Sequence, residues 1–140
     1  KLQSWMQPIF GNLGFLLAGK GGDARRNPGA RIAALISKGI LELEALTYIR
    51  GRSIPAHYVI IDEAQNLTPH EVKTIVSRAG EGTKMVLTGD PNQIDNPYLD
   101  ASSNGLTVTV EQFKHEAIHG HVTLRKSERS ELAALAARLL

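Results

Sequence analysis

The sequence predicts an α/β domain in which a parallel sheet is flanked by helices. Residues 58–61 form an apolar, β-branched run, and residues 84–87 form a second apolar run, as expected of strands buried on both faces. An amphipathic helix is predicted between them, and strands that alternate with helices are typical of parallel sheets. Residues 121–124 are expected to add a third strand.

The N-terminal third is predicted to be mostly helical. Apolar residues recur at helical spacing over residues 2–17 and again over residues 32–39. Between them, residues 19–29 are rich in glycine and arginine and predict a loop. Residues 45–49 are the best candidate for an additional strand in this part of the chain.

The helix between the first two strands carries its own start signal. Thr68 can act as the N-cap, Pro69 suits the first helical position, and Glu71 can complete a capping box. The apolar stripe of this helix is expected to end at Gly80.

Polar loop residues follow the second strand. Residues 91–105 are rich in Pro, Asn, Asp and Ser, which indicates a functional loop. Residues 106–117 are predicted to be helical, although residues 107–110 also suit a strand. A final amphipathic helix is expected over residues 132–139.

The composition is that of a globular protein and excludes few classes of function. Of the 140 residues, 42% are hydrophobic and 21% charged, and the formal net charge of +2 is too small to establish a nucleic-acid partner. The absence of cysteine excludes disulfides and thiolate metal sites. No apolar run approaches the roughly 20 residues that span a bilayer, so no membrane partner is expected. A cytoplasmic location is expected.

Acidic side chains follow the two strands directly. Asp62-Glu63 comes after the first strand and Thr88-Gly89-Asp90 after the second. Because ligands of open parallel sheets bind beyond the carboxyl ends of the strands, these residues are expected to share a site. A solvated acidic turn is the alternative for Asp62-Glu63 alone, but the second strand end favours a functional site.

This pattern suits phosphoryl transfer. Mg²⁺ that bridges phosphates requires hard oxygen ligands, and Asp62 supplies one. A neighbouring carboxylate can orient and deprotonate the attacking water, which is the role expected of Glu63. Gln93, on the turn after Asp90, could hydrogen-bond a γ-phosphate or that water.

The two motifs together resemble the PhoH-like ATPases, which are relatives of superfamily 1 helicases with a RecA-like core. The residues that carry the resemblance are Ile60-Ile61-Asp62-Glu63-Ala64-Gln65-Asn66 and Leu87-Thr88-Gly89-Asp90-Pro91-Asn92-Gln93-Ile94-Asp95, with Tyr48-Ile49-Arg50-Gly51-Arg52 upstream and Glu128-Arg129-Ser130 downstream. The resemblance is closest to the subfamily in which a PIN ribonuclease domain precedes the ATPase. From about Trp5 onwards, the chain resembles the second half of that ATPase domain.

The resemblance implies a partial RecA-like P-loop NTPase fold and an Mg²⁺-dependent ATPase that acts on RNA. Asp62 and Glu63 would be the Walker B carboxylates, and Thr88, Asp90 and Gln93 would form the helicase motif III sensor. ATP and Mg²⁺ are the implied ligands, and single-stranded RNA is an implied partner. The resemblance also implies a ring-shaped homo-oligomer with ATP at its subunit boundaries.

Two arginines are candidates for contact with the transferred phosphate, because an arginine that reaches the developing charge speeds phosphoryl transfer. Arg129 matches the family's arginine at the start of the last helix and is the first candidate for an arginine finger. Arg52 is the second, because the glycine beside it allows close approach to a phosphate. A surface salt bridge or an RNA-backbone contact is the alternative for each.

The phosphate loop of this fold is missing from the sequence. Residues 14–21 resemble G-x-x-x-x-G-K-[ST], but Gly21 replaces the hydroxyl residue and the preceding periodicity is helical. In the family the true loop would lie upstream of Lys1. Its strand would stand between the second and third strands predicted here, so a sheet without it is expected to have an exposed or re-paired edge.

Three other interpretations of the sequence remain. His115, His119 and His121 could bind a metal, but no carboxylate or thiolate completes the set, and a solvated helix end is favoured. The domain could be a degenerate ATPase-like module that binds RNA or a partner without hydrolysis. A purely structural oligomerisation domain would leave the two strand-end motifs unexplained.

Overall fold

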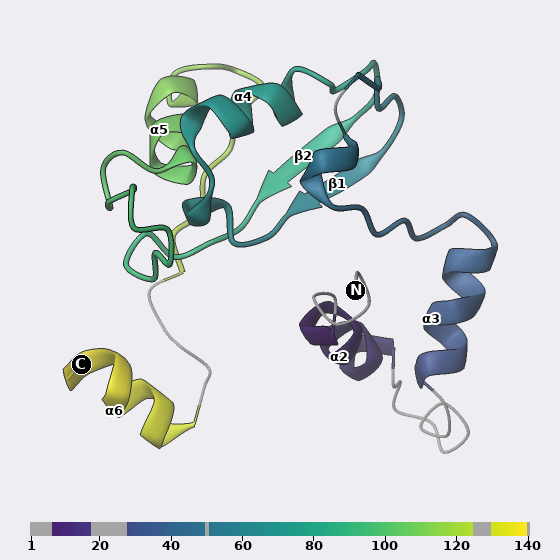
Figure 1. The fold of residues 1–140 in the computed structure, drawn as a ribbon, viewed down its shortest axis with the longest axis horizontal. Coiled ribbons are helices and arrows are strands. Elements are labelled where there is room, and N and C mark those ends of the chain that lie inside the picture. The colour runs from purple at the N-terminus through teal and green to yellow at the C-terminus, as the bar shows by residue number, and fades with distance from the viewer. Residues whose placement is uncertain (1–6, 18–27, 50, 125–129, 140) are drawn as a thin grey trace. The chain divides into compact units, whose positions relative to one another are not determined.

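The chain divides into two compact units, residues 1–53 and residues 54–140 (Figure 1). The computed structural model describes residues 7–17, 28–49, 51–124 and 130–139. The strand-end motifs lie in the second unit.

The first unit is helical. Helix α2 (Gln7–Leu17) packs against helix α3 (Pro28–Ser37), which confirms the two helices predicted here. Of the predicted loop, residues 28 and 29 belong to α3, and residues 19–27 lie outside the described residues.

The predicted strand at residues 45–49 is wrong, because Leu46–Tyr48 form a 3₁₀ turn, η1. A strand needs a neighbour for its backbone N–H and C=O groups. The described part of this unit contains no strand with which residues 45–49 could pair.

The second unit contains a parallel sheet flanked by helices, as predicted. Strands β1 (Tyr58–Ile61) and β2 (Lys84–Leu87) pair in parallel, with Tyr58 opposite Lys84 and Ile61 opposite Leu87. Helix α4 (Pro69–Val76) provides the crossover between the two strands, and the 3₁₀ turn η2 (Ala64–Asn66) precedes it.

The core of this unit lies on one face of the sheet, where α4 and α5 (Gly105–Phe113) pack side by side (Figure 1). The buried cluster is formed by Ile61, Ala64 and Ile75. The expectation that β1 is buried on both faces is wrong: Tyr58 and Ile60 are 66% and 64% exposed. Side chains alternate along a strand, so helices on a single face leave these two residues uncovered.

The third predicted strand is also wrong, because residues 121–124 form no strand. Val122 and Leu124 are 80% and 88% exposed. Within the described residues the sheet consists of β1 and β2 alone. The predicted strand order placed the P-loop strand between β2 and residues 121–124, and without that neighbour the segment has no ladder to join.

Helix α4 begins as its sequence predicts. The Glu71 N–H donates to Thr68 Oγ1 at 3.2 Å, and the Thr68 N–H donates to Glu71 Oε2 at 2.8 Å, which completes the capping box. The helix ends at Val76 rather than at Gly80.

The helical alternative for residues 106–117 is correct, although α5 ends earlier than predicted, at Phe113. Its N-cap is Asn104, which is completely buried. The Asn104 side chain accepts from the Thr107 N–H at 2.9 Å and donates to the Asp100 carbonyl at 2.9 Å and the Ala101 carbonyl at 3.1 Å. These bonds favour the helical alternative over a strand.

The substitution Asn104→Ala is expected to lower the free energy of unfolding by about 1–3 kcal/mol. It removes the helix cap and leaves two carbonyl groups without their buried donor. The midpoint and slope of urea unfolding would measure this change. An effect of a few tenths of a kcal/mol would contradict the assigned role of Asn104.

The last helix, α6 (Glu131–Leu139), is confirmed. Its apolar residues Leu132, Leu135 and Leu139 are exposed. In the described segments, every helix is too short or too polar to span a bilayer.

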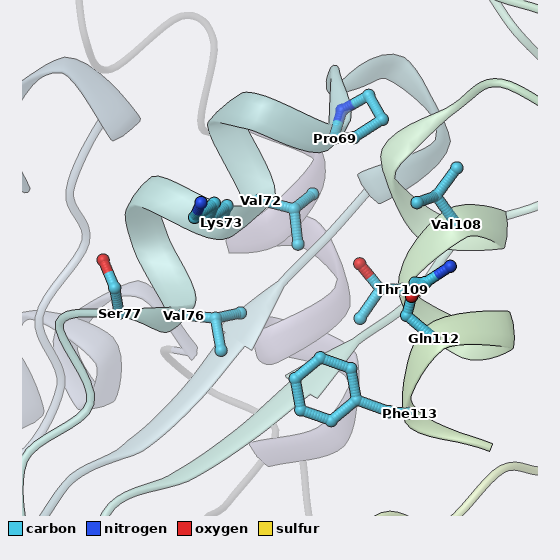
Figure 2. A pocket seen from close by; sticks show the side chains of 9 residues that line it. All are labelled: Pro69, Val72, Lys73, Val76, Ser77, Val108, Thr109, Gln112 and Phe113. Atoms are coloured by element: carbon cyan, nitrogen blue, oxygen red, sulfur yellow. The ribbon is translucent and has the colours of Figure 1, made fainter. Parts of the chain in front are cut away.

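A groove of about 400 Å³ lies between α4 and α5 (Figure 2). Its lining is mostly apolar and includes Val72, Val76, Val108 and Phe113. None of the residues predicted to act on a nucleotide lines it, so the candidate site is not in this groove.

Candidate functional site

The parallel register brings the carboxyl ends of β1 and β2 to the same edge of the sheet. Asp62 follows β1 and Thr88 follows β2, and the Thr88 hydroxyl donates to Asp62 Oδ1 at 2.7 Å. A backbone hydrogen bond also links the two segments, because the Ala64 N–H donates to the Thr88 carbonyl at 2.9 Å. The two predicted strand ends are therefore one structural site.

The Asp62 carboxylate is exposed but held in place. Its Oδ1 accepts from Thr88 and from the Glu63 N–H, the latter at 3.1 Å. Within the described residues Oδ2 accepts no hydrogen bond, so one hard anionic oxygen remains for a metal ion or its water. A carboxylate oxygen is the kind of ligand that Mg²⁺ prefers, and the metal-binding role of Asp62 stays a prediction.

Glu63 has a left-handed backbone conformation, with φ 54° and ψ 38°. This region is uncommon for a residue with a Cβ atom. The conformation turns the chain from β1 into η2, for which Glu63 is the N-cap residue. The Glu63 side chain is exposed, and its Oε2 accepts from Gln65 Nε2 at 2.6 Å. Neighbours in sequence, Asp62 and Glu63 thus have different side-chain partners.

Gln65 is a site residue for which no role was predicted. Its side chain is fully buried, as is that of Ala64 before it. It bonds to Glu63 and also to the loop after β2, through the Gln93 carbonyl at 2.9 Å and the Asp90 N–H at 3.3 Å. Its position in the motif Asp62-Glu63-Ala64-Gln65 was the available signal, but burial of an amide depends on contacts distant in sequence.

The loop after β2 is built around Asp90. The Asp90 carboxylate accepts from the Asn92 N–H at 2.9 Å and from Gln93 Nε2 at 2.7 Å. Asp90 therefore shapes the turn and orients the Gln93 side chain. The ligand contacts predicted for Thr88, Asp90 and Gln93 stay predictions.

The far end of the same loop is held by Asn66. Asn66 Oδ1 accepts from the Asp95 N–H at 2.7 Å and from the Asn96 N–H at 3.3 Å. Because Gln65 holds the near end, two adjacent residues of η2 anchor both ends of the loop. Farther on, hydrogen bonds from Ser102 and Ser103 lower the pKa of Asp100 to about 2, in a turn that leads into α5.

Of the two candidate arginines, the structure describes Arg52 alone. Arg52 belongs to the first unit and pairs with Glu44 at 2.6 Å and with Glu42 at 3.5 Å. The hydrogen bond and charge of Glu44 raise the pKa of Arg52. The surface salt bridge foreseen as the alternative is therefore present, and a phosphate contact of Arg52 stays a prediction. Arg129 lies outside the described residues.

As far as the structure describes them, the remaining motifs show no second site. Gly14 lies within α2, whereas residues 18–21 of the phosphate-loop-like segment are outside the described residues. His119 packs its ring against Phe113 with centroids 6.3 Å apart, and His121 Nε2 lies 3.0 Å from the Thr123 hydroxyl. Where the structure describes the chain, no group of three or more His, Cys, Asp and Glu side chains is arranged to hold a metal ion.

Comparison with known proteins supports the family resemblance that the two strand-end motifs carry. The chain is 59% identical to Protein PhoH2 of Bacillus subtilis over 140 residues, which is all of this chain and 30% of that protein. It is 37% identical to Protein PhoH2 of Mycolicibacterium smegmatis, with the same coverage. The PhoH-like protein of Bacillus subtilis is 46% identical over 80 residues, or 57% of this chain and 24% of that protein.

The chain thus spans less than a third of the length of these relatives. The family described as PhoH-like protein matches residues 1–139, a range that includes both strand-end motifs. This chain belongs to the PhoH-like protein family.

Proposed function

We propose that this chain supplies the metal-binding and water-activating residues of an Mg²⁺-dependent ATPase site. The observation that carries the proposal is the pair of adjacent, exposed carboxylates at the shared strand edge, each held by a different partner. Thr88 holds Asp62 at 2.7 Å, and Gln65 holds Glu63 at 2.6 Å. Separate anchoring allows the two carboxylates to perform different tasks.

Asp62 is the proposed metal ligand. Bound Mg²⁺ would neutralise charge on the phosphate oxygens, and an aspartate beside it often acts through a retained water. The bond from Thr88 restrains the Asp62 side chain, so little conformational entropy is lost when Oδ2 takes its ligand.

Glu63 is the proposed base. A carboxylate near the γ-phosphate can orient the attacking water and accept its proton. The Gln93 side chain, which Asp90 orients, is the proposed sensor of the γ-phosphate. Arg129 remains the first candidate for an arginine finger and Arg52 the second.

The proposal requires a phosphate loop that these 140 residues do not contain. Backbone N–H groups of such a loop cradle the phosphates, and its lysine reaches the β- and γ-phosphates. We therefore propose that the chain acts as part of a longer polypeptide. Single-stranded RNA as the polymer acted upon, and a ring-shaped homo-oligomer as the assembly, are proposed from the family resemblance.

ATP hydrolysis by the full-length gene product, compared with hydrolysis by the isolated 140-residue chain, tests this function. We expect Mg²⁺-dependent phosphate release from the full-length protein, stimulated by single-stranded RNA, and no turnover by the isolated chain. Removal of Mg²⁺ with EDTA should stop the reaction, and added Mg²⁺ should restore it.

Two results would contradict parts of the proposal. Turnover by the isolated chain that Glu63→Gln abolishes would show that no external phosphate loop is needed. A full-length protein that binds RNA but hydrolyses no nucleotide would instead be a degenerate ATPase-like binding module.

A further inference from the structure

Gln65 has the geometry of a residue that holds other groups in place. Its side chain is fully buried, although a glutamine amide prefers water. Both N–H groups of the amide are used, because Nε2 donates to Glu63 Oε2 at 2.6 Å and to the Gln93 carbonyl at 2.9 Å. Oε1 accepts from the Asp90 N–H at 3.3 Å. Two acceptors face the nitrogen and one donor faces the oxygen, so the orientation of the amide is unambiguous.

The bond to Glu63 is the functional one. A glutamate side chain on the surface samples many rotamers, and an attacking water needs a base in one position. The bond from Gln65 Nε2 is charge-assisted, which makes it one of the stronger kinds of hydrogen bond. Since the donor is buried and bonded to two further groups, Glu63 is held although its own side chain is exposed.

The other two bonds link Glu63 to the loop after β2. The Gln93 carbonyl and the Asp90 N–H belong to the loop that carries the proposed phosphate sensor. The backbone of this loop lies directly against the amide: a Cβ atom at Gly89 would lie 2.1 Å from Gln65 Oε1. A shift of the loop therefore has to move the amide that holds Glu63.

We propose that Gln65 is a positioning residue that fixes the Glu63 carboxylate and couples its position to the loop carrying Asp90 and Gln93. The inference rests on the proposed ATPase function. The response of this loop to the γ-phosphate would reach Glu63 through one buried amide, so the base would adopt its working position when the sensor is engaged.

The variant Gln65→Met tests the proposal in the full-length protein. Methionine is close to glutamine in volume and unbranched, so it fills the space but makes none of the three bonds. We expect kcat for ATP hydrolysis to fall about 10- to 100-fold, because misplacing a catalytic group by about 1 Å can cost on the order of 100-fold. KM for ATP should stay unchanged, since Gln65 is not proposed to touch the nucleotide.

Asn104→Ala is the matched control. Asn104 is likewise a fully buried amide, but it caps α5, and its side chain bonds to Asp100, Ala101 and Thr107, none of which is a proposed site residue. At a temperature where both variants are folded, Asn104→Ala should keep the wild-type kcat. An equal loss of kcat in both variants would overturn the proposal, because it would reduce Gln65 to a structural role.

Hydrogen–deuterium exchange gives a readout that does not depend on hydrolysis. Glu63→Ala should speed amide exchange in residues 89–94 of the wild-type background, because Gln65 loses one of its partners. In the Gln65→Met background the same substitution should add nothing. Additive effects of the two substitutions would overturn the coupling.

The kinetic and exchange experiments together distinguish failure of the proposed function from failure of the inference about Gln65. Absence of ATP hydrolysis in the wild-type protein would refute the proposed function, and the exchange experiment would still decide whether Gln65 couples Glu63 to the loop. Normal hydrolysis with an unchanged kcat in Gln65→Met would refute the inference and leave the proposed function intact.

Discussion

Replacing Glu63 with glutamine in the full-length protein is expected to lower kcat for ATP hydrolysis by about 10²- to 10⁴-fold, the range supplied by a positioned general base. Glutamine has the shape of glutamate and can still accept the hydrogen bond from Gln65 Nε2. The substitution therefore removes the proton acceptor and retains the geometry. Nucleotide affinity should change little, because Asp62 and the phosphate loop would hold the nucleotide.

Single-turnover phosphate release would measure the chemical step, and the fluorescence of a labelled nucleotide would measure binding. Glu111→Gln is a suitable control, because Glu111 is an exposed glutamate on α5 that pairs with Lys114 at 3.3 Å and neither residue belongs to the proposed site. A kcat for Glu63→Gln close to that of Glu111→Gln would exclude Glu63 as the base.

The second large effect is expected from Gly89→Ala. The added Cβ would lie 2.1 Å from Gln65 Oε1, 3.1 Å from Leu106 Cδ2 and 3.3 Å from the Ala64 nitrogen. Gln65 is buried and bonded on three sides, so it has no open space into which to turn. We expect the free energy of unfolding to fall by about 1–3 kcal/mol, the usual cost of overpacking a core.

Gly120→Ala provides a matched control, since a Cβ there would meet nothing within 4 Å. The midpoints of urea unfolding of the two variants and the wild type would be compared. Gly89→Ala should also slow ATP hydrolysis, because the displaced amide would release Glu63. Unfolding midpoints that are equal for the two variants would mean that the loop after β2 yields to the methyl group.

The features that could be predicted from the sequence are those that residues close in sequence determine. The apolar runs at residues 58–61 and 84–87 became strands with the predicted bounds, and Thr68 and Glu71 formed the predicted capping box. These elements depend on residues near in sequence. The approach of Asp62 to Thr88 was also predictable, because parallel strands place their carboxyl ends together.

The errors and omissions concern contacts between distant segments. Residues 45–49 and 121–124 suit strands, but a strand also needs a neighbour that local patterns do not supply. The buried amide of Gln65 depends on the Gln93 carbonyl and the Asp90 N–H, which only the folded chain brings near. No pattern of residue types predicts these partners.

At Glu63 the left-handed backbone lowers folding stability, whereas the proposed chemistry needs the carboxylate of this side chain. A residue with a Cβ atom costs about 1–2 kcal/mol in this region, and glycine or asparagine costs less. Selection for stability alone would replace Glu63 with one of these residues and lose the carboxylate. With Glu63 as the proposed base, the chain has a carboxylate at this position at the cost of a less stable turn, and a relative with glycine or asparagine there is expected to lack hydrolysis.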